Sequence, residues 1–220
     1  ATGGDASLGG DDFDHEIAKH FLKELLNDKI SSNDIKTALS SARVLKEQLS
    51  VQDNGEWVFK LGDAEINHKV DRTTFENLIS SLVERTIDIC KNVCADANLL
   101  PSGIKGVVLV GGSTRIPFVR HKVAELFGKE PLSDINPDEV VAIGAALQAE
   151  ALTVGSETLL LDVTPLSLGI ETMGGMVEKI IPRNTPIPVA KAQEFTTYVD
   201  GQTAMVVHAT QGEREMVNDN

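Results

Sequence analysis

The sequence predicts an α/β region followed by an all-β region. In the first region apolar residues recur with helical spacing, and the run 107–110 (Val-Val-Leu-Val) is typical of a strand buried on both faces. Beyond about residue 156 the helical periodicity stops, and four of the eight prolines fall between Pro165 and Pro188. We therefore expect two domains with a boundary in the segment 156–165.

The first region is expected to hold five helices and one hairpin. Phe13, Ile17, Phe21 and Leu25 recur every four residues and predict a helix over 11–26. A second helix is predicted over 33–49, followed by a hairpin over 56–70, a helix over 72–97 and another over 117–127. The inward residues of the second helix are expected to be Ile35, Leu39, Ala42, Leu45 and Leu49.

The boundaries of these elements follow from capping and turn residues. Asp71 or Thr73 is expected to cap the helix over 72–97, since Thr73 has capping-box spacing to Glu76. The fifth helix begins near Asn136 and carries small residues at 144–146 that permit close packing. Strand-like runs in the second region are predicted at 166–171, 177–181, 194–199 and 203–209, and Asp200-Gly201 is a hairpin signal.

Charge and composition exclude several classes of protein. The chain has 220 residues, 20 Lys+Arg against 33 Asp+Glu and a net charge of −13, which argues against a nucleic-acid or anionic-membrane binder. No apolar stretch approaches the roughly 18 residues of a membrane helix, and no signal peptide is visible. The glycine-rich start without Met and the end after a strand-like run suggest a piece of a longer chain.

The two cysteines and five histidines carry no metal-site pattern. Cys90 and Cys94 are four residues apart on one predicted helix face, but a zinc or cluster site normally has four ligands. We interpret both as small core residues of a protein from a reducing compartment. None of the histidines is assigned to a site, and no metal site is expected.

The segment 107–117 is the most informative motif. A buried strand that runs into Gly111-Gly112 and then a helix leaves backbone N–H groups accessible, which suits a nucleotide. It is neither a P-loop, because no Gly-Lys-Ser/Thr follows, nor Gly-x-Gly-x-x-Gly. From spacing alone a plain strand–helix turn is an equally open reading.

The same segment resembles the adenosine motif of the 70-kilodalton heat-shock chaperones, members of the actin-like ATPase superfamily. Other segments resemble this family in the same order, and the resemblance covers essentially the whole chain: 1–18, 135–150, 159–175 and 202–215. It implies that 1–155 is the second lobe of an actin-like nucleotide-binding domain. It further implies an interdomain linker over 156–165 and, over 166–220, the first strands of a β-sandwich peptide-binding domain.

The resemblance implies a set of adenosine contacts in this chain, with ATP or ADP as the cofactor. They are Lys46, Ser50, Gly111, Gly112, Ser113, Arg115 and Asp138. Lys46 and Ser50 are four residues apart, so both reach one ligand from a single helix face. The family usually has Glu where this chain has Arg43, which removes a carboxylate that accepts from the ribose hydroxyls. Magnesium and phosphate are expected to be held mainly outside this chain. The piece alone is therefore expected to bind adenosine weakly and not to hydrolyse ATP, and it holds no catalytic residue.

A second set of residues is implied for an extended apolar peptide. They are Ile170, Thr172, Met173, Phe195, Tyr198, Met205 and Val207, with Leu159, Leu160, Leu161 and Asp162 as the linker. Met173 and Tyr198 match an arch over the peptide, and Met205 matches a central pocket. Without the resemblance, the large apolar residues read equally as part of a sandwich core.

The family resemblance implies an ATP-dependent chaperone. The segment 176–205 resembles the branch that serves iron–sulfur cluster assembly, so the expected client is the iron–sulfur scaffold protein and the expected partner a J-type co-chaperone. A bacterial-type cytoplasmic location is expected, without nucleic-acid or membrane partners. The alternatives are a general protein-folding chaperone of the same family or, for the piece alone, a non-catalytic peptide-binding module.

Overall fold

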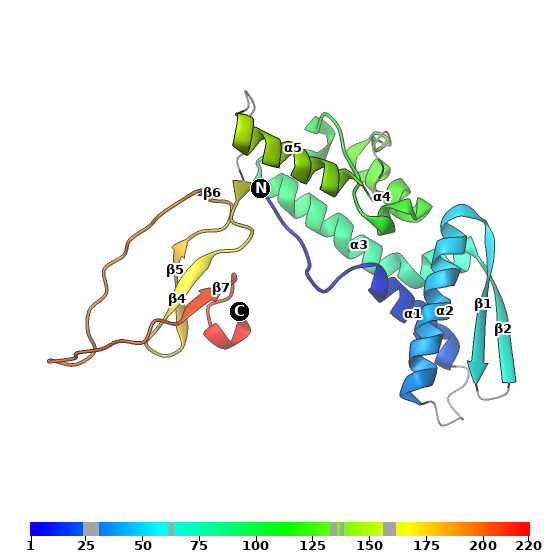
Figure 1. The fold of residues 1–220 in the computed structure, drawn as a ribbon, viewed down its shortest axis with the longest axis horizontal. Coiled ribbons are helices and arrows are strands. Elements are labelled where there is room, and N and C mark those ends of the chain that lie inside the picture. The colour runs from blue at the N-terminus through cyan, green and yellow to red at the C-terminus, as the bar shows by residue number, and fades with distance from the viewer. Residues whose placement is uncertain (24–30, 62–63, 133–135, 137–138, 156–161) are drawn as a thin grey trace. The chain divides into compact units, whose positions relative to one another are not determined.

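The computed structural model describes residues 1–23, 31–61, 64–132, 136, 139–155 and 162–220. Contacts divide the chain into two units, one formed by Gly4–Gly155 and the other by Ser156–Asn220 together with Ala1–Gly3. In the part of the chain that the structure describes, the first unit is mainly helical and the second consists mostly of short strands and loops (Figure 1). No helix of the described residues is long and apolar enough to cross a membrane.

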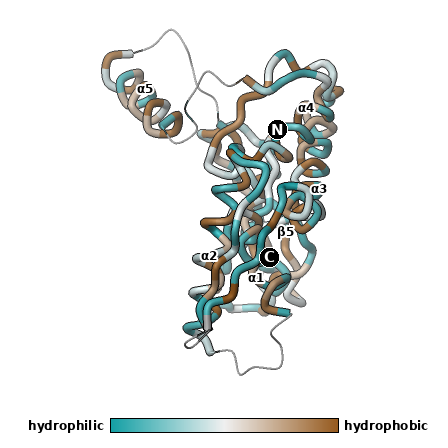
Figure 2. The backbone as a smooth tube through the Cα atoms, turned by 90° about the vertical axis from the view of Figure 1, so that its right-hand side faces the viewer, coloured by the Kyte–Doolittle hydropathy of each residue, from teal (hydrophilic) through white to brown (hydrophobic). Residues whose placement is uncertain are grey.

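The first two helices of the larger unit are capped by side chains. Helix α1 spans Gly10–Leu22 and helix α2 spans Ser32–Val51. Asp12 accepts from the Gly9 backbone N–H at 2.6 Å, and the Ser31 hydroxyl accepts from the N–H three residues on at 3.2 Å. Hydrophobic and hydrophilic residues alternate in short stretches along α2 (Figure 2), as an amphipathic helix requires. The buried apolar residues of α1 recur every four residues as predicted: Phe13, Ile17 and Phe21.

The expected inward face of α2 is confirmed except at its start. Ala42, Leu45 and Leu49 are buried and Leu39 is half-buried against the core, but Ile35 is 45% exposed. The prediction for Ile35 is wrong because the packed face of α2 begins only at Ala38, one turn later. The end predicted for the first helix, including Leu25 and Leu26, lies outside the described residues.

The predicted hairpin is present and completes the main core. Strand β1 (Asn54–Leu61) pairs antiparallel with strand β2 (Ala64–Asp71), and its turn at 62–63 lies outside the described residues. Trp57 and Phe59 are fully buried and stack at 5.2 Å between ring centroids. The Trp57 indole N–H donates to the Ala38 carbonyl of α2 at 3.3 Å. This bond and the aromatic packing fix the hairpin against α2, the helix that carries Lys46.

Two further helices enclose a smaller core. Helix α3 (Arg72–Asp96) begins at Asp71, whose carboxylate accepts from the Thr74 N–H at 2.7 Å, so Asp71 and not Thr73 is the cap. Helix α4 spans Pro117–Phe127 as predicted. Cys94 is buried in this second core and Cys90 packs against it. Burial raises the pKa of the Cys90 thiol, which fits the predicted role of a core residue.

The buried strand predicted at 107–110 is not observed. Val108 forms a single parallel bridge with Leu132, and Val108 and Val110 are 47% and 44% exposed. The reason is the lack of neighbours: a strand is buried on both faces only inside a sheet, and within the described residues Leu132 alone pairs with this run.

Helix α5 spans Val140–Val154, and its start is close to the predicted one, since the Asn136 carbonyl accepts from the Val140 N–H at 3.1 Å. The small residues at 144–146 are exposed, and none of the helix's own residues is buried. The close packing expected of them is therefore not present in the described part of the chain.

The second unit contains two small sheets. Strands β4 (Leu168–Thr172), β5 (Met176–Ile181) and β7 (Ala209–Gln211) form a sheet in the order β5-β4-β7. Strands β3 (Asp162–Val163) and β6 (Pro186–Ile187) pair separately. The buried Ser167, just before β4, donates its N–H and hydroxyl to the Glu213 carboxylate, just after β7, at 2.8 and 3.2 Å. These bonds connect β4 and β7 at that end of the three-stranded sheet. The predicted strands at 166–171 and 177–181 are thus observed with small shifts.

The strands predicted at 194–199 and 203–209 are wrong. Residues 191–208 contain no strand, and β7 begins only at Ala209. Gly201 has the positive φ of 74° that a tight turn requires, but the segments on either side of it do not pair with each other. Val206 is 93% exposed, so these apolar residues lack the neighbouring strand that would bury and order them.

Candidate functional site

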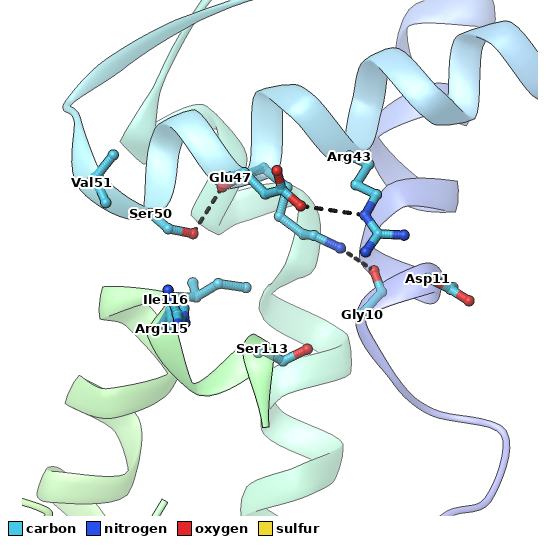
Figure 3. Close-up of a pocket in the computed structure, with 11 residues that line it drawn as sticks. Gly10, Asp11, Arg43, Glu47, Ser50, Val51, Ser113, Arg115 and Ile116 are labelled. Atoms are coloured by element: carbon cyan, nitrogen blue, oxygen red, sulfur yellow. Dashed lines mark hydrogen bonds and ion pairs between the residues drawn. The ribbon is translucent and has the colours of Figure 1, made fainter. Parts of the chain in front are cut away.

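A cavity of about 540 Å³ lies in the larger unit between α2, the start of α1 and the short 3-10 turn Gly112–Arg115 (Figure 3). This volume is within the usual range for a small-molecule site. Five of the residues expected to contact adenosine line it: Lys46, Ser50, Gly112, Ser113 and Arg115. Gly111 directly precedes the 3-10 turn, and Asp138 lies outside the described residues.

Helix α2 supplies one wall through residues four apart. The Lys46 ammonium donates to the Gly10 carbonyl at 2.8 Å, the bond drawn to Gly10 in Figure 3. The Ser50 hydroxyl donates to the Lys46 carbonyl at 2.8 Å, which leaves its oxygen lone pairs as acceptors toward the cavity. Lys46 and Ser50 therefore present a cation and a hydroxyl from the same helix face, as their spacing predicts.

The opposite wall is formed by the 3-10 turn that follows Gly111, with Ile116 after it. Gly111 has φ of 91°, a conformation that favours glycine, and the next four residues turn as a 3-10 helix. The Thr114 hydroxyl donates to the Gly111 carbonyl at 2.7 Å and holds this turn closed. The Gly-Gly motif therefore places Gly112 at the edge of the cavity.

The end of the cavity is formed by a close approach of three elements at Gly10. A Cβ atom at this position would lie 3.0 Å from the Ser113 hydroxyl and 3.2 Å from the Lys46 ammonium. Both distances are tighter than ordinary contacts, so a methyl group there would displace both side-chain ends by a few tenths of an ångström. No sequence signal pointed to Gly10, because the crowding arises from residues that are far apart in the chain.

Asp14 lies behind Lys46 and is almost completely buried. Its carboxylate oxygen is 2.8 Å from the Lys46 ammonium, with the two side chains 7% and 13% exposed. Burial raises the pKa of the Asp14 carboxyl, and the contact with Lys46 opposes this shift without cancelling it. No local sequence pattern pointed to this contact.

The cavity contains carboxylates even though Arg43 stands where the family has Glu. Glu47 and Asp11 both line it, and the Arg43 guanidinium donates to Glu47 at 3.3 Å (Figure 3). Sequence reasoning missed Glu47, although its position four residues after Arg43 and three before Ser50 was a usable signal. The loss of an acceptor at position 43 is therefore accompanied by a carboxylate one turn further along α2.

The residues expected to bind peptide lie in the smaller unit. Ile170 and Thr172 belong to β4 and are half-buried, whereas Met173 is 75% and Tyr198 81% exposed. Three further residues lie outside strands and are exposed: Phe195, Met205 and Val207. Of the linker residues, Asp162 begins β3, while 159–161 lie outside the described residues. The described residues include no cluster of three His, Cys, Asp or Glu that could hold a metal ion.

Comparison with known proteins covers the whole chain. The family model "Hsp70 protein" matches residues 1–220. A chaperone protein HscA homolog from Histophilus somni (strain 129Pt) is 54% identical over 222 residues, which cover 100% of this chain and 35% of that protein. HscA homologs from Pseudoalteromonas atlantica and Burkholderia multivorans are 53% and 50% identical, with 100% of this chain and 36% of each relative covered. The chain thus spans about a third of the length of these curated relatives.

Proposed function

The chain belongs to the Hsp70 family, and we propose that the protein containing it is an ATP-dependent molecular chaperone of the HscA type. In this proposal residues 1–155 are the second lobe of the nucleotide-binding domain and 156–165 the linker. Residues 166–220 begin the β-sandwich that binds the client peptide. The match of the whole chain to HscA homologs supports this assignment.

The single observation that carries the nucleotide-binding proposal is the cavity that gathers Lys46, Ser50 and the Gly112–Arg115 turn. A nucleoside offers hydroxyl donors and acceptors and a flat base, and the cavity offers an ammonium, hydroxyls, backbone and two carboxylates. Asp11 and Glu47 serve as acceptors, whereas Lys46 and Arg115 serve as donors to the nucleoside. We assign the cavity to adenosine and leave magnesium and most of the phosphate contacts to the remaining two thirds of the protein.

The proposed mechanism couples two sites through a two-state change. ATP closes the nucleotide lobes, the linker docks and the peptide site opens, and hydrolysis reverses the bias. Phosphoryl transfer depends on positioning and charge stabilisation from both lobes. Residues 1–220 by themselves are accordingly expected to show no multiple-turnover ATPase activity.

We further propose that the client is an iron–sulfur scaffold protein and that a J-type co-chaperone stimulates hydrolysis in the bacterial cytoplasm. The HscA naming of the relatives and the similarity of 176–205 to that branch support this specialisation. The competing proposal is a general folding chaperone of the same family. The two differ in client preference, because a specialist discriminates against generic apolar peptides.

Calorimetric titration of the full-length protein with ADP tests the nucleotide proposal. Lys46→Ala is expected to weaken binding by about tenfold or more, since it removes a charged donor. Lys60→Ala is the matched control, because Lys60 is a 72% exposed lysine on the hairpin. If the wild type does not bind ADP, the chaperone-ATPase assignment fails and the plain peptide-binding module is favoured. Equal affinity in Lys46→Ala and wild type would remove Lys46 from the site.

A further inference from the structure

A buried ion pair stands behind the proposed nucleotide site. Asp14 comes from the first half of α1 and Lys46 from α2, and their charged atoms are 2.8 Å apart at 7% and 13% side-chain exposure. Taking two charges out of water is costly, and a buried pair often stabilises a protein no better than apolar residues would. The position of this pair at a cavity therefore suggests a role other than stability.

The contacts of Lys46 show what the pair does to its ammonium group. The group has three N–H donors. The Gly10 carbonyl accepts one of them at 2.8 Å, and Asp14 Oδ1 lies 2.8 Å from the ammonium as an ion-pair contact without a hydrogen bond of its own. Within the described residues these are the polar contacts of the ammonium, so donors remain for a ligand in the cavity that Lys46 lines. One hydrogen bond and one ion pair on a flexible side chain determine where the remaining donors point.

Asp14 itself is not a ligand contact. It is absent from the described residues that line the nucleotide cavity and instead borders a separate hollow with Leu39 and Ser40. The charges of Asp11 and Arg43 affect the pKa of the Asp14 carboxyl, but the residue that forms an ion pair with it, at 2.8 Å, is Lys46. Any effect of Asp14 on a ligand must therefore pass through Lys46 or through the fold.

We propose that Asp14 is a positioning residue of the nucleotide site, whose ion pair holds the Lys46 ammonium so that a donor not taken by Gly10 faces the nucleoside. This inference rests on the proposed function, since it presumes an adenosine ligand in the cavity. Without Asp14 the Lys46 side chain keeps one anchor, the Gly10 carbonyl, and swings about it. The loss of a fixed direction weakens a hydrogen bond that depends on alignment.

Adenosine affinity of the full-length protein, measured by calorimetry, tests the proposal. Adenosine is uncharged, so a change in net charge at Asp14 has little direct effect on it. Asp14→Asn is expected to weaken adenosine binding by about fivefold to tenfold in the wild-type background. In a Lys46→Met background the same substitution is expected to change affinity by less than about twofold, because no ammonium remains to be positioned. Asp88→Asn is the matched control, since it breaks an exposed Asp–Lys pair on α3.

Each outcome decides between the proposals. A loss in wild type that disappears in the Lys46→Met background supports the positioning role. Adenosine affinity that falls with Lys46→Met but not with Asp14→Asn overturns the positioning role and leaves the nucleotide site intact. An equal loss of affinity on Asp14→Asn in the wild-type and Lys46→Met backgrounds has the same meaning. If the wild type binds neither adenosine nor ADP, both proposals fail. Should Asp14→Asn unfold the protein, Asp14→Glu keeps the charge but moves the carboxylate by one methylene, and unchanged affinity in that variant contradicts the role.

Discussion

Substitution of Gly10 by alanine is expected to weaken ADP binding without lowering the free energy of unfolding. Gly10 is the first residue of α1, and an added methyl group would lie 3.0 Å from the Ser113 hydroxyl and 3.2 Å from the Lys46 ammonium. Ordinary contacts begin at 3.4 Å, so these groups must move by at least 3.4 − 3.0 = 0.4 Å and 3.4 − 3.2 = 0.2 Å. Both are groups that we assign to the adenosine site, and both would be displaced together.

The expected size of the effect follows from the hydrogen bond that Lys46 offers. A bond to a charged group contributes about 2 kcal/mol, and losing half of it weakens ADP binding by about fivefold. The same change is expected to leave the free energy of unfolding equal or to raise it by up to about 1 kcal/mol, because alanine favours a helix over glycine. Calorimetric titration and urea unfolding of the full-length protein measure the two quantities.

Gly9→Ala is the matched control for this experiment. A methyl group there would meet no atom within 4 Å, and the residue lies next to Gly10 in the chain. We expect unchanged ADP affinity in this variant. The reasoning is refuted if Gly10→Ala binds ADP as tightly as the wild type, or if Gly9→Ala weakens binding to the same extent.

Three other experiments probe the end of α2, the buried carboxyl and the peptide segment. Arg72→Ala removes donors to the Leu49 and Gln52 carbonyls at 3.0 and 2.8 Å at the end of α2. Urea unfolding should show a loss of about 2 kcal/mol, and an unchanged midpoint would contradict this account. The Asp14 carboxyl has a raised pKa, so the folded state binds its proton more readily than the unfolded chain. Protonation at low pH therefore stabilises the folded state, and this stabilisation is lost as pH rises through the folded pKa. The stability of wild type relative to Asp14→Asn should therefore fall as pH rises from about 4 toward neutrality, and a flat difference would show that burial does not shift this group. If the full-length protein is a specialist, it prefers a scaffold-derived peptide over generic apolar peptides in competition binding, and Tyr198→Ala combined with Met205→Val reduces that preference. A wild type without preference would favour the general chaperone.

The sequence predicted the elements whose stabilising contacts are local. The four-residue spacing in α1, the cap at Asp71 and Pro117 at the start of α4 were sufficient to place three helices. The hairpin could also be placed, because its alternating residues Trp57 and Phe59 pack on a helix that directly precedes it in the chain.

The errors concern segments that depend on distant partners. The run at 107–110 has the composition of a buried strand, but burial requires strands on both sides, and the described residues provide a single bridge to Leu132. The same argument applies to 194–199 and 203–209, which have strand-like residues without an adjacent strand. Composition determines whether a residue suits a sheet, whereas pairing determines whether a sheet forms.

The candidate site was predictable only where the family resemblance carried it. The resemblance implied Lys46, Ser50 and the Gly-Gly turn, and the structure brings them around one cavity. The contributions of Gly10 and Asp14 could not be predicted, because the first depends on a close approach and the second on burial beside a lysine 32 positions later. Both properties belong to the packed structure and not to any local pattern.

We propose that the cavity between α2 and the Gly112–Arg115 turn holds the adenosine of the bound nucleotide. A crystal structure of the full-length protein with ADP would show where the nucleoside lies. We expect the ribose within hydrogen-bond distance of Lys46 and Ser50, with the base beside the Gly-Gly turn and Asp14 still paired to Lys46. Well-defined ADP at another place, with this cavity unoccupied, would contradict it.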